Sequence, residues 1–517
     1  MSIAKRLISG SIASWVQIAI TIIAQVALLP IYLSSWDIKT FGLWIAVQGL
    51  SGMMTSLDTG HHTYLSFEFI RLGRDKLKLT SFYLWSGVWV GLIMGFLPIV
   101  IIIIGLLSGT YKYFLTDKVG GNTDLVFQAG IVLLLQAATW FICSSVGGLF
   151  LRVLSAFDYY ARIAWWNAGI AAFTTILPAV AVFFGAGLLT TGIIQAIIAV
   201  IGFGMLNIDV FYLLRKEKIS FSKGSLKFGW KNFTNSLVLS VKNLLENVRN
   251  VGFRAILAVL TSAANLVTFS SIRTGANFAM QGLHTITYPL MPDLIRFLHQ
   301  RDQQRSETAF GTIWIIVVAI MAPALIVLQI FIEPLFHLWT RGKVPFDPIL
   351  FAVLSLSVMV YAISQPAIAV ITGNNLLKIQ FNISALAAFV VVAGSVLTVP
   401  AAGILGAGVV LLLSEIASAI WYNQTAKVWL ANNGLLWPKM AWRSALLSVV
   451  ITAAGMAAII MVPSFKYISL IATLVLMFIN AFKYWQFLPP LARQRTTEIL
   501  KKSPFVKYFI TVSSPVS

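Results

Sequence analysis

The chain has 517 residues, of which 58% are hydrophobic and only 10% are charged, and its formal net charge is +20. Soluble globular chains carry about 25% charged residues, so this composition excludes a soluble protein. A basic excess can indicate nucleic-acid binding. Here, however, the lysines and arginines gather in alternate connections between apolar runs, as membrane topology and anionic lipid headgroups require. The composition therefore predicts an all-α, polytopic integral membrane protein with no nucleic-acid partner.

Apolar runs long enough to span a bilayer recur along the whole chain, and we count about fourteen of them. The connections between them are too short for a soluble domain. The predicted spans are residues 9–33, 40–65, 82–107, 126–151, 162–184, 188–214, 235–261, 264–290, 308–332, 348–371, 379–399, 403–425, 441–463 and 466–487.

The positive-inside rule orients these spans with both termini in the cytoplasm, as expected in a bacterial inner membrane. The first ten residues resemble a signal peptide, but the apolar run after them is too long, so we expect the first helix to be retained. Cys143 is the only cysteine, which excludes a disulfide framework and a thiolate metal cluster. Metalloprotease, P-loop and Gly-x-Ser-x-Gly motifs are absent from the sequence. We therefore expect no enzymatic activity, no catalytic residue, no metal site and no cofactor.

The predicted helix 235–261 carries an unusual set of polar groups for a membrane span. At about 100° per residue, these groups fall on one arc of the helix. Each charge at the centre of a membrane helix costs about 2.5–3.5 kcal/mol, so such an arc must border water or a polar ligand. The pattern predicts a cationic, water-filled cavity that binds an anion. The groups on the arc are Lys242, Asn243, Glu246, Asn247, Arg249, Asn250 and Arg254.

A structural alternative stays open for this helix. Lys242 and Glu246 are four residues apart, and Glu246 and Arg249 are three apart, so they can form a buried ion-pair network. Even in such a network the arc carries three cations, Lys242, Arg249 and Arg254, and only one anion, Glu246.

Weaker polar stripes mark other helices. The predicted helix 264–290 carries Ser270, Arg273, Asn277, Gln281 and His284, the first helix carries Ser14, Gln17, Thr21 and Gln25, and the second carries Gln48 to His62. These stripes predict a central cleft between two halves of the protein. The carboxylates Asp58, Glu246 and Glu415 are candidates for coupling transport to Na⁺ or H⁺. The alternative is that the uncharged groups only join helices by hydrogen bonds.

Three short motifs near the N-terminus resemble the opening of a known family. They are Pro30-Ile31-Tyr32-Leu33, Phe41-Gly42-Leu43-Trp44 and Ser56-Leu57-Asp58-Thr59-Gly60. The same pattern is found in the polysaccharide-transporter family, whose members are flippases for lipid-linked O-antigen and exopolysaccharide repeat units. The ending Tyr288-Pro289-Leu290-Met291-Pro292 is also similar to that family. The resemblance covers residues 1–75 by motif and the remainder by helix layout.

The resemblance implies two six-helix lobes around a cationic cavity that binds the phosphate or pyrophosphate of an undecaprenyl-linked oligosaccharide. Lys242, Arg249, Arg254 and Arg273 would bind this headgroup, and Asn243, Asn247, Asn250, Asn277 and Gln281 would line the cavity. The expected partners are membrane lipids and polysaccharide polymerase or export machinery, and the expected state is a monomer. The implied domains are an N-terminal lobe (1–214), a basic linker (215–234), a C-terminal lobe (235–427), a helix pair (428–487) and a basic tail (488–517).

One departure from the family concerns the helix count. Many polysaccharide flippases have twelve helices, whereas the last two predicted here are similar to the extra pair of the lipid II flippases. A lipid II flippase is therefore one alternative function. A multidrug cation antiporter is another, although it would need an acidic cavity. A non-transporting membrane scaffold is the third, and it leaves the charges of helix 235–261 without a purpose.

Overall fold

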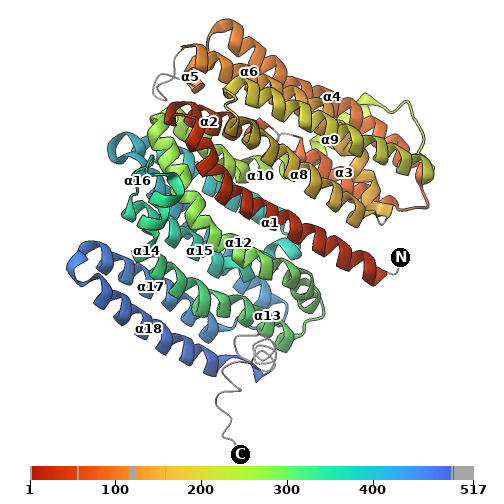
Figure 1. The fold of residues 1–517 in the computed structure, drawn as a ribbon. Coiled ribbons are helices and arrows are strands. Elements are labelled where there is room, and N and C mark those ends of the chain that lie inside the picture. Colours follow the sequence, from red (N-terminus) through yellow and green to blue (C-terminus); the bar gives the residue numbers. More distant parts are fainter. Residues whose placement is uncertain (1–2, 55–57, 116–122, 158, 491–492, 494–517) are drawn as a thin grey trace, which may run out of the picture. The chain divides into compact units, whose positions relative to one another are not determined.

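The computed structural model describes residues 3–54, 58–115, 123–157, 159–490 and 493 (Figure 1). Within these residues all regular secondary structure is helical and no β-strand occurs, which confirms the all-α prediction. Ten of the described helices are long and apolar enough to cross a membrane. The ten account for every predicted span except 40–65, 235–261 and 264–290. The described residues of those three regions are also mostly helical, and these regions carry the predicted stripes that lower their hydropathy.

The chain divides into two compact units. Unit 1 consists of Met1–Gly275, Leu335–Phe346 and Gln380–Ser414, and unit 2 consists of Ala276–Pro334, Asp347–Ile379 and Glu415–Ser517. The predicted lobe and linker boundaries stay predictions. Within the predicted linker, α10 already begins at Leu226, where the Ser225 side chain accepts a hydrogen bond from the Phe228 amide.

Unit 1 contains the whole N-terminal half of the sequence and two later segments. In it α1 packs along α8, α8 packs on α9, and α10 packs against α3 and α4 (Figure 1). Its apolar core includes Leu65, Phe69, Leu84, Leu149 and Leu206. Its helices are α1 (Ile3–Ser35), α2 (Ile38–Met54), α3 (Thr59–Leu72), α4 (Leu77–Ser108), α5 (Tyr111–Leu115), α6 (Thr123–Trp140), α7 (Gly147–Val153), α8 (Tyr160–Phe183), α9 (Leu188–Lys216), α10 (Leu226–Asn247) and α11 (Phe253–Leu260), followed by the first part of α12 (Ala263–His299).

Unit 2 is built mainly from the C-terminal helices. In it α17 packs along α18 and α15 packs against α17 (Figure 1). Asn480 of α18 joins α17 by donating hydrogen bonds to the Ser444 carbonyl at 2.9 Å and the Ser448 hydroxyl at 2.8 Å. Its helices are α13 (Gln303–Ile316), α15 (Pro348–Gly373), α17 (Lys439–Met461) and α18 (Lys466–Phe487), with the part of α14 (Ala322–Thr340) up to Pro334, the last part of α12 and the two end parts of α16 (Leu377–Asn432).

The helix α16 contains the break that the sequence predicts between residues 399 and 403. Pro400 lies inside the helix, and Gly403 has φ 57° and ψ −144°, a conformation outside the helical region that glycine adopts readily. Three π-helical turns interrupt other helices: Phe141–Ser145, Val248–Gly252 and Val317–Met321. The second of these lies in the middle of the predicted charged helix, where it affects the candidate site.

Candidate anion-binding cavity

The predicted polar arc on helix 235–261 is not continuous in the structure. The π turn Val248–Gly252 separates α10 from α11. A π turn holds one residue more than an α turn and so rotates the following helix by about 100° relative to the preceding one. Lys242 and Glu246 therefore precede the change of phase, whereas Arg254 follows it. Sequence periodicity assumes one unbroken helix and does not detect this change.

Before the π turn, the polar groups pair with one another. Lys242 Nζ lies 3.1 Å from Glu246 Oε1, and Ser384 of α16 donates a hydrogen bond to the same oxygen at 3.3 Å. The structural ion-pair alternative is thus confirmed for Lys242 and Glu246. The asparagines Asn243 and Asn247 are half-buried on this part of the helix, and Asn250 in the π turn is exposed.

Arg249 and Arg273 are also close together. The Arg273 guanidinium donates a hydrogen bond to the Arg249 carbonyl at 3.4 Å, and it lies over the Phe253 ring with 5.7 Å between Cζ and the ring centroid. Both side chains are half-buried. Aromatic stacking and a carbonyl partner lower the cost of holding such a guanidinium in the membrane part of the protein.

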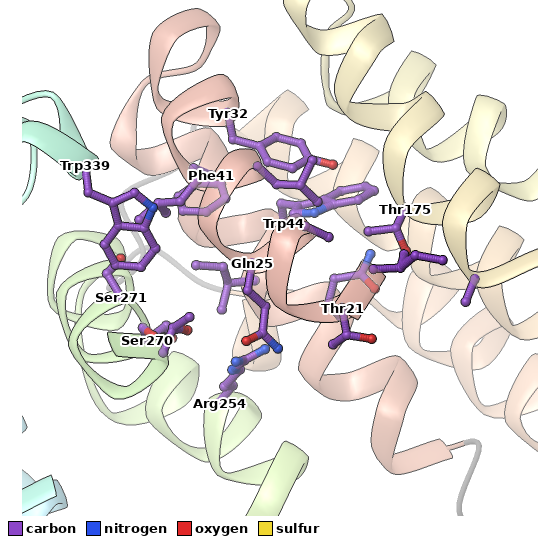
Figure 2. Close-up of a pocket in the computed structure, with 18 residues that line it drawn as sticks. Thr21, Gln25, Tyr32, Phe41, Trp44, Thr175, Arg254, Ser270, Ser271 and Trp339 are labelled. Atoms are coloured by element: carbon purple, nitrogen blue, oxygen red, sulfur yellow. Dashed lines mark hydrogen bonds between the residues drawn. The ribbon is translucent and has the colours of Figure 1, made fainter. Parts of the chain in front are cut away.

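Arg254 has different surroundings. It lines a cavity of about 330 Å³ within unit 1 (Figure 2). Close packing of α11 on α2 holds it there, because a Cβ atom on Gly49 would lie only 3.1 Å from the Arg254 Cβ. No hydrogen bond or ion pair joins Arg254 to another residue of the described chain, and its Nε is buried.

Two serine hydroxyls in the same cavity are also buried without a hydrogen-bond partner among the described residues. Ser270 and Ser271 line the same cavity and are 5% and 2% exposed. Neither Oγ atom has a hydrogen-bond partner among the described residues. A buried polar group without a partner costs about 1–3 kcal/mol. One guanidinium and two hydroxyls thus line one cavity with hydrogen-bonding capacity that the described protein does not use.

The cavity is lined by all four of the helices whose sequences carry polar stripes. Thr21 and Gln25 come from α1, Gln48 from α2, Arg254 from α11 and Ser270 from α12. Its other lining residues include several aromatic side chains that were not predicted to bind a ligand, namely Tyr32, Phe41, Trp44 and Trp339. Among the described residues that line the cavity there is no aspartate or glutamate.

The other predicted site residues lie elsewhere. Asp58 is 2% exposed just before α3, with Oδ2 3.9 Å from His62 Nε2, and that nitrogen lies 2.9 Å from the Ser145 carbonyl oxygen. Glu415, Asn277 and Gln281 belong to unit 2 and are half-buried. The roles of these residues in ion coupling or substrate binding stay predictions, and His284 lies outside the described side chains.

Comparisons with known proteins identify the fold. No family model matches the sequence, and no curated protein matches it. Among solved structures, the lipid II flippase MurJ in an inward closed conformation has a TM-score of 0.64 and 10% identity, covering 93% of this chain and 99% of that chain.

Two transporters are also similar. An inward-facing multidrug-resistance MATE transporter has a TM-score of 0.62 and 13% identity, covering 80% of this chain and 95% of that chain. A transporter of the MOP superfamily from Pyrococcus furiosus, described as having a binding pocket of reverse polarity, has a TM-score of 0.52 and 13% identity, covering 83% of this chain and 96% of that chain.

The chain therefore shares the fold of these three proteins. It is a multi-pass membrane protein, and the similar structures just described are those of transporters and a flippase.

Proposed function

We propose that this protein is a flippase that moves an undecaprenyl-(pyro)phosphate-linked oligosaccharide from the cytoplasmic to the outer leaflet of the bacterial inner membrane. The observation that carries the proposal is the cavity in unit 1, where Arg254, Ser270 and Ser271 hold unused hydrogen-bonding groups. A guanidinium binds phosphate through parallel N–H donors, and hydroxyls donate to the remaining phosphate oxygens. An anionic headgroup would thus offset the cost of burying these three groups.

The charge of the cavity separates this function from its main rival. A multidrug cation antiporter needs carboxylates that face its substrate, whereas the charged residue of the described lining is Arg254. An organic cation placed there would meet an arginine in a poorly screened environment, which is unfavourable. The net basic character of helix 235–261 supports the same choice.

A lipid II flippase is the second candidate. The alignment with MurJ covers 93% of this chain, compared with 80% for the inward-facing MATE transporter. Lipid II also presents a pyrophosphate next to a sugar, so the same cavity chemistry would serve it. The two substrates differ in their saccharide and in the peptide that lipid II carries.

The test is direct binding of lipid-linked substrates to the purified protein in nanodiscs. Hydrogen bonds to charged groups contribute about 1.5–3 kcal/mol, so Arg254→Ala should weaken binding of undecaprenyl-pyrophosphate oligosaccharide by about tenfold to a hundredfold. Arg254→Lys keeps the charge but loses the parallel donors, so we expect an intermediate loss. Arg215→Ala, which removes an exposed arginine of α9, is the matched control and should leave affinity unchanged.

Competition then distinguishes the candidates. Displacement of the bound oligosaccharide lipid by lipid II at equal concentration would favour a lipid II flippase. Wild-type affinity in Arg254→Ala, or tighter binding of cationic dyes than of either lipid, would refute the proposed function.

A further inference from the structure

The cavity in unit 1 has two chemically different ends. Arg254 lies at one end, and the rings of Tyr32, Phe41 and Trp44 gather at the other (Figure 2). Trp339, from the segment Leu335–Phe346, adds a fourth ring to the lining. A phosphate occupies only the first end, so the aromatic end must accommodate a different part of a ligand.

The aromatic end is a rigid cluster. The Tyr32 ring lies 5.6 Å from the Phe41 ring with 22° between their planes, and 6.0 Å from the Trp44 ring. Trp36 packs behind them, with its ring centroid 5.1 Å from Tyr32 and 5.8 Å from Trp44. Mutual packing fixes these side chains, so a ligand that binds to them loses little additional side-chain entropy.

Uncharged polar side chains also line the cavity, namely Thr21, Gln25, Gln48 and Thr175. Of these, Gln25 lies beside Arg254 (Figure 2). The Gln48 amide donates to Gln195 Oε1 at 3.4 Å, and Gln136 donates to the same oxygen at 3.1 Å, so a chain of three glutamines from α2, α9 and α6 orients Gln48.

The rings and the polar side chains together favour one part of a lipid-linked saccharide, the sugar ring, over the isoprenoid chain. An isoprenoid chain would cover the rings but would bring no hydrogen-bonding group to the polar side chains of the lining. A sugar ring has an apolar face formed by C–H groups and an edge of hydroxyls, so it matches both kinds of group. The cavity volume of about 330 Å³ is near the lower end of the range for ligand pockets, which suits the portion next to the phosphate rather than a whole repeat unit.

We infer that the aromatic end of the cavity is a subsite for the sugar ring attached to the phosphate, with Trp44 and Tyr32 as its platform and Gln48 as a hydroxyl partner. The inference rests on the proposed function, and it adds that the aromatic end of the cavity recognises the saccharide. Arg254, Ser270 and Ser271 bind the phosphate whatever the sugar. The aromatic end then makes the protein prefer a glycosylated lipid.

Two lipids test this assignment: undecaprenyl pyrophosphate, and the same lipid carrying one sugar. Binding of each is measured in nanodiscs for the wild type, Trp44→Leu, Gln48→Leu and a control, Trp230→Leu, which removes an exposed indole of α10. Aromatic contacts contribute about 0.5–1.5 kcal/mol, so Trp44→Leu should lower affinity for the glycosylated lipid by about threefold to tenfold. Gln48→Leu should do the same, while affinity for the bare lipid stays within about twofold of wild type in both variants.

The outcomes distinguish failure of the sugar subsite from failure of the proposed flippase function. Equal affinity of the wild type for both lipids, or an unchanged sugar preference in both variants, overturns the subsite and leaves the flippase function standing. Failure of the wild type to bind either lipid overturns the proposed function itself. Gln48→Leu replaces a half-buried side chain by one of similar size, so it keeps the test decisive if Trp44→Leu does not fold.

Discussion

A hydrogen bond between Trp339 and α1 leads to a sharp prediction. Pro30 lies inside α1, and because proline has no N–H, the carbonyl four residues earlier, that of Val26, loses its helical partner. The Trp339 indole N–H donates to this carbonyl at 2.6 Å. Lys343 Nζ donates at 2.5 Å to the Leu33 carbonyl, which lies in the last turn of α1. The segment Leu335–Phe346 thus joins unit 1 through carbonyls that helical bonding leaves open.

The magnitude follows from the geometry. Trp339→Phe keeps a ring but removes the donor, so the hydrogen bond to the half-exposed Val26 carbonyl is lost at a cost of about 0.5–1.5 kcal/mol. Pro30→Ala restores an N–H that can bond to Val26 within α1. In the Pro30→Ala background, Trp339→Phe should therefore cost about 1 kcal/mol less than in the wild type.

The assay is the free energy of unfolding in SDS and dodecylmaltoside mixed micelles, followed by far-ultraviolet circular dichroism for the wild type, both single variants and the double variant. The expected coupling energy is about 1 kcal/mol. Additive effects, with a coupling energy below about 0.3 kcal/mol, would refute the claim that Trp339 replaces the missing N–H of residue 30.

Two further predictions use the same or a spectroscopic readout. A Cβ on Gly60 would lie 2.2 Å from the Ser240 Cα, so Gly60→Ala should lower the free energy of unfolding by at least about 3 kcal/mol or prevent folding. The control Gly169→Ala meets no atom within 4 Å and should be neutral or slightly stabilising, and equal effects of the two variants would contradict this packing. The Tyr159 hydroxyl donates to Glu217 Oε1 at 2.6 Å, and this carboxylate raises the pKa of Tyr159 above its ordinary value of 10.0. Because the folded-state pKa is the higher one, the stabilisation is complete below about pH 10 and is lost as pH rises through the folded-state value. Carbon-13 NMR of labelled tyrosine, with Tyr159→Phe for assignment, should show Tyr159 titrating above free tyrosine, and Glu217→Gln should remove the shift. An unshifted Tyr159 would refute this interaction.

Much of the fold could be predicted from the sequence because the decisive property is local. A run of apolar residues must form a helix in lipid, since backbone groups have no other hydrogen-bond partners there. The predicted break at residues 399–403 appears at Gly403 for a similarly local reason. The polar stripes were also readable, since charges on a membrane helix must avoid lipid, and Thr21, Gln25, Gln48, Arg254 and Ser270 do line one cavity.

The pairing of those groups was not readable from the sequence. Periodicity placed Lys242 and Arg254 on one arc, but the π turn Val248–Gly252 changes the phase between them, so Lys242 pairs with Glu246 while Arg254 enters the cavity. Trp339 reaches the same cavity from a segment more than 300 positions after Val26, which no local pattern indicates. The sequence by itself determined which helices must hide polar groups from lipid, because that cost depends on each helix alone. Only the tertiary structure decided which of those groups neutralise one another and which remain available to a ligand, because that depends on packing between distant helices.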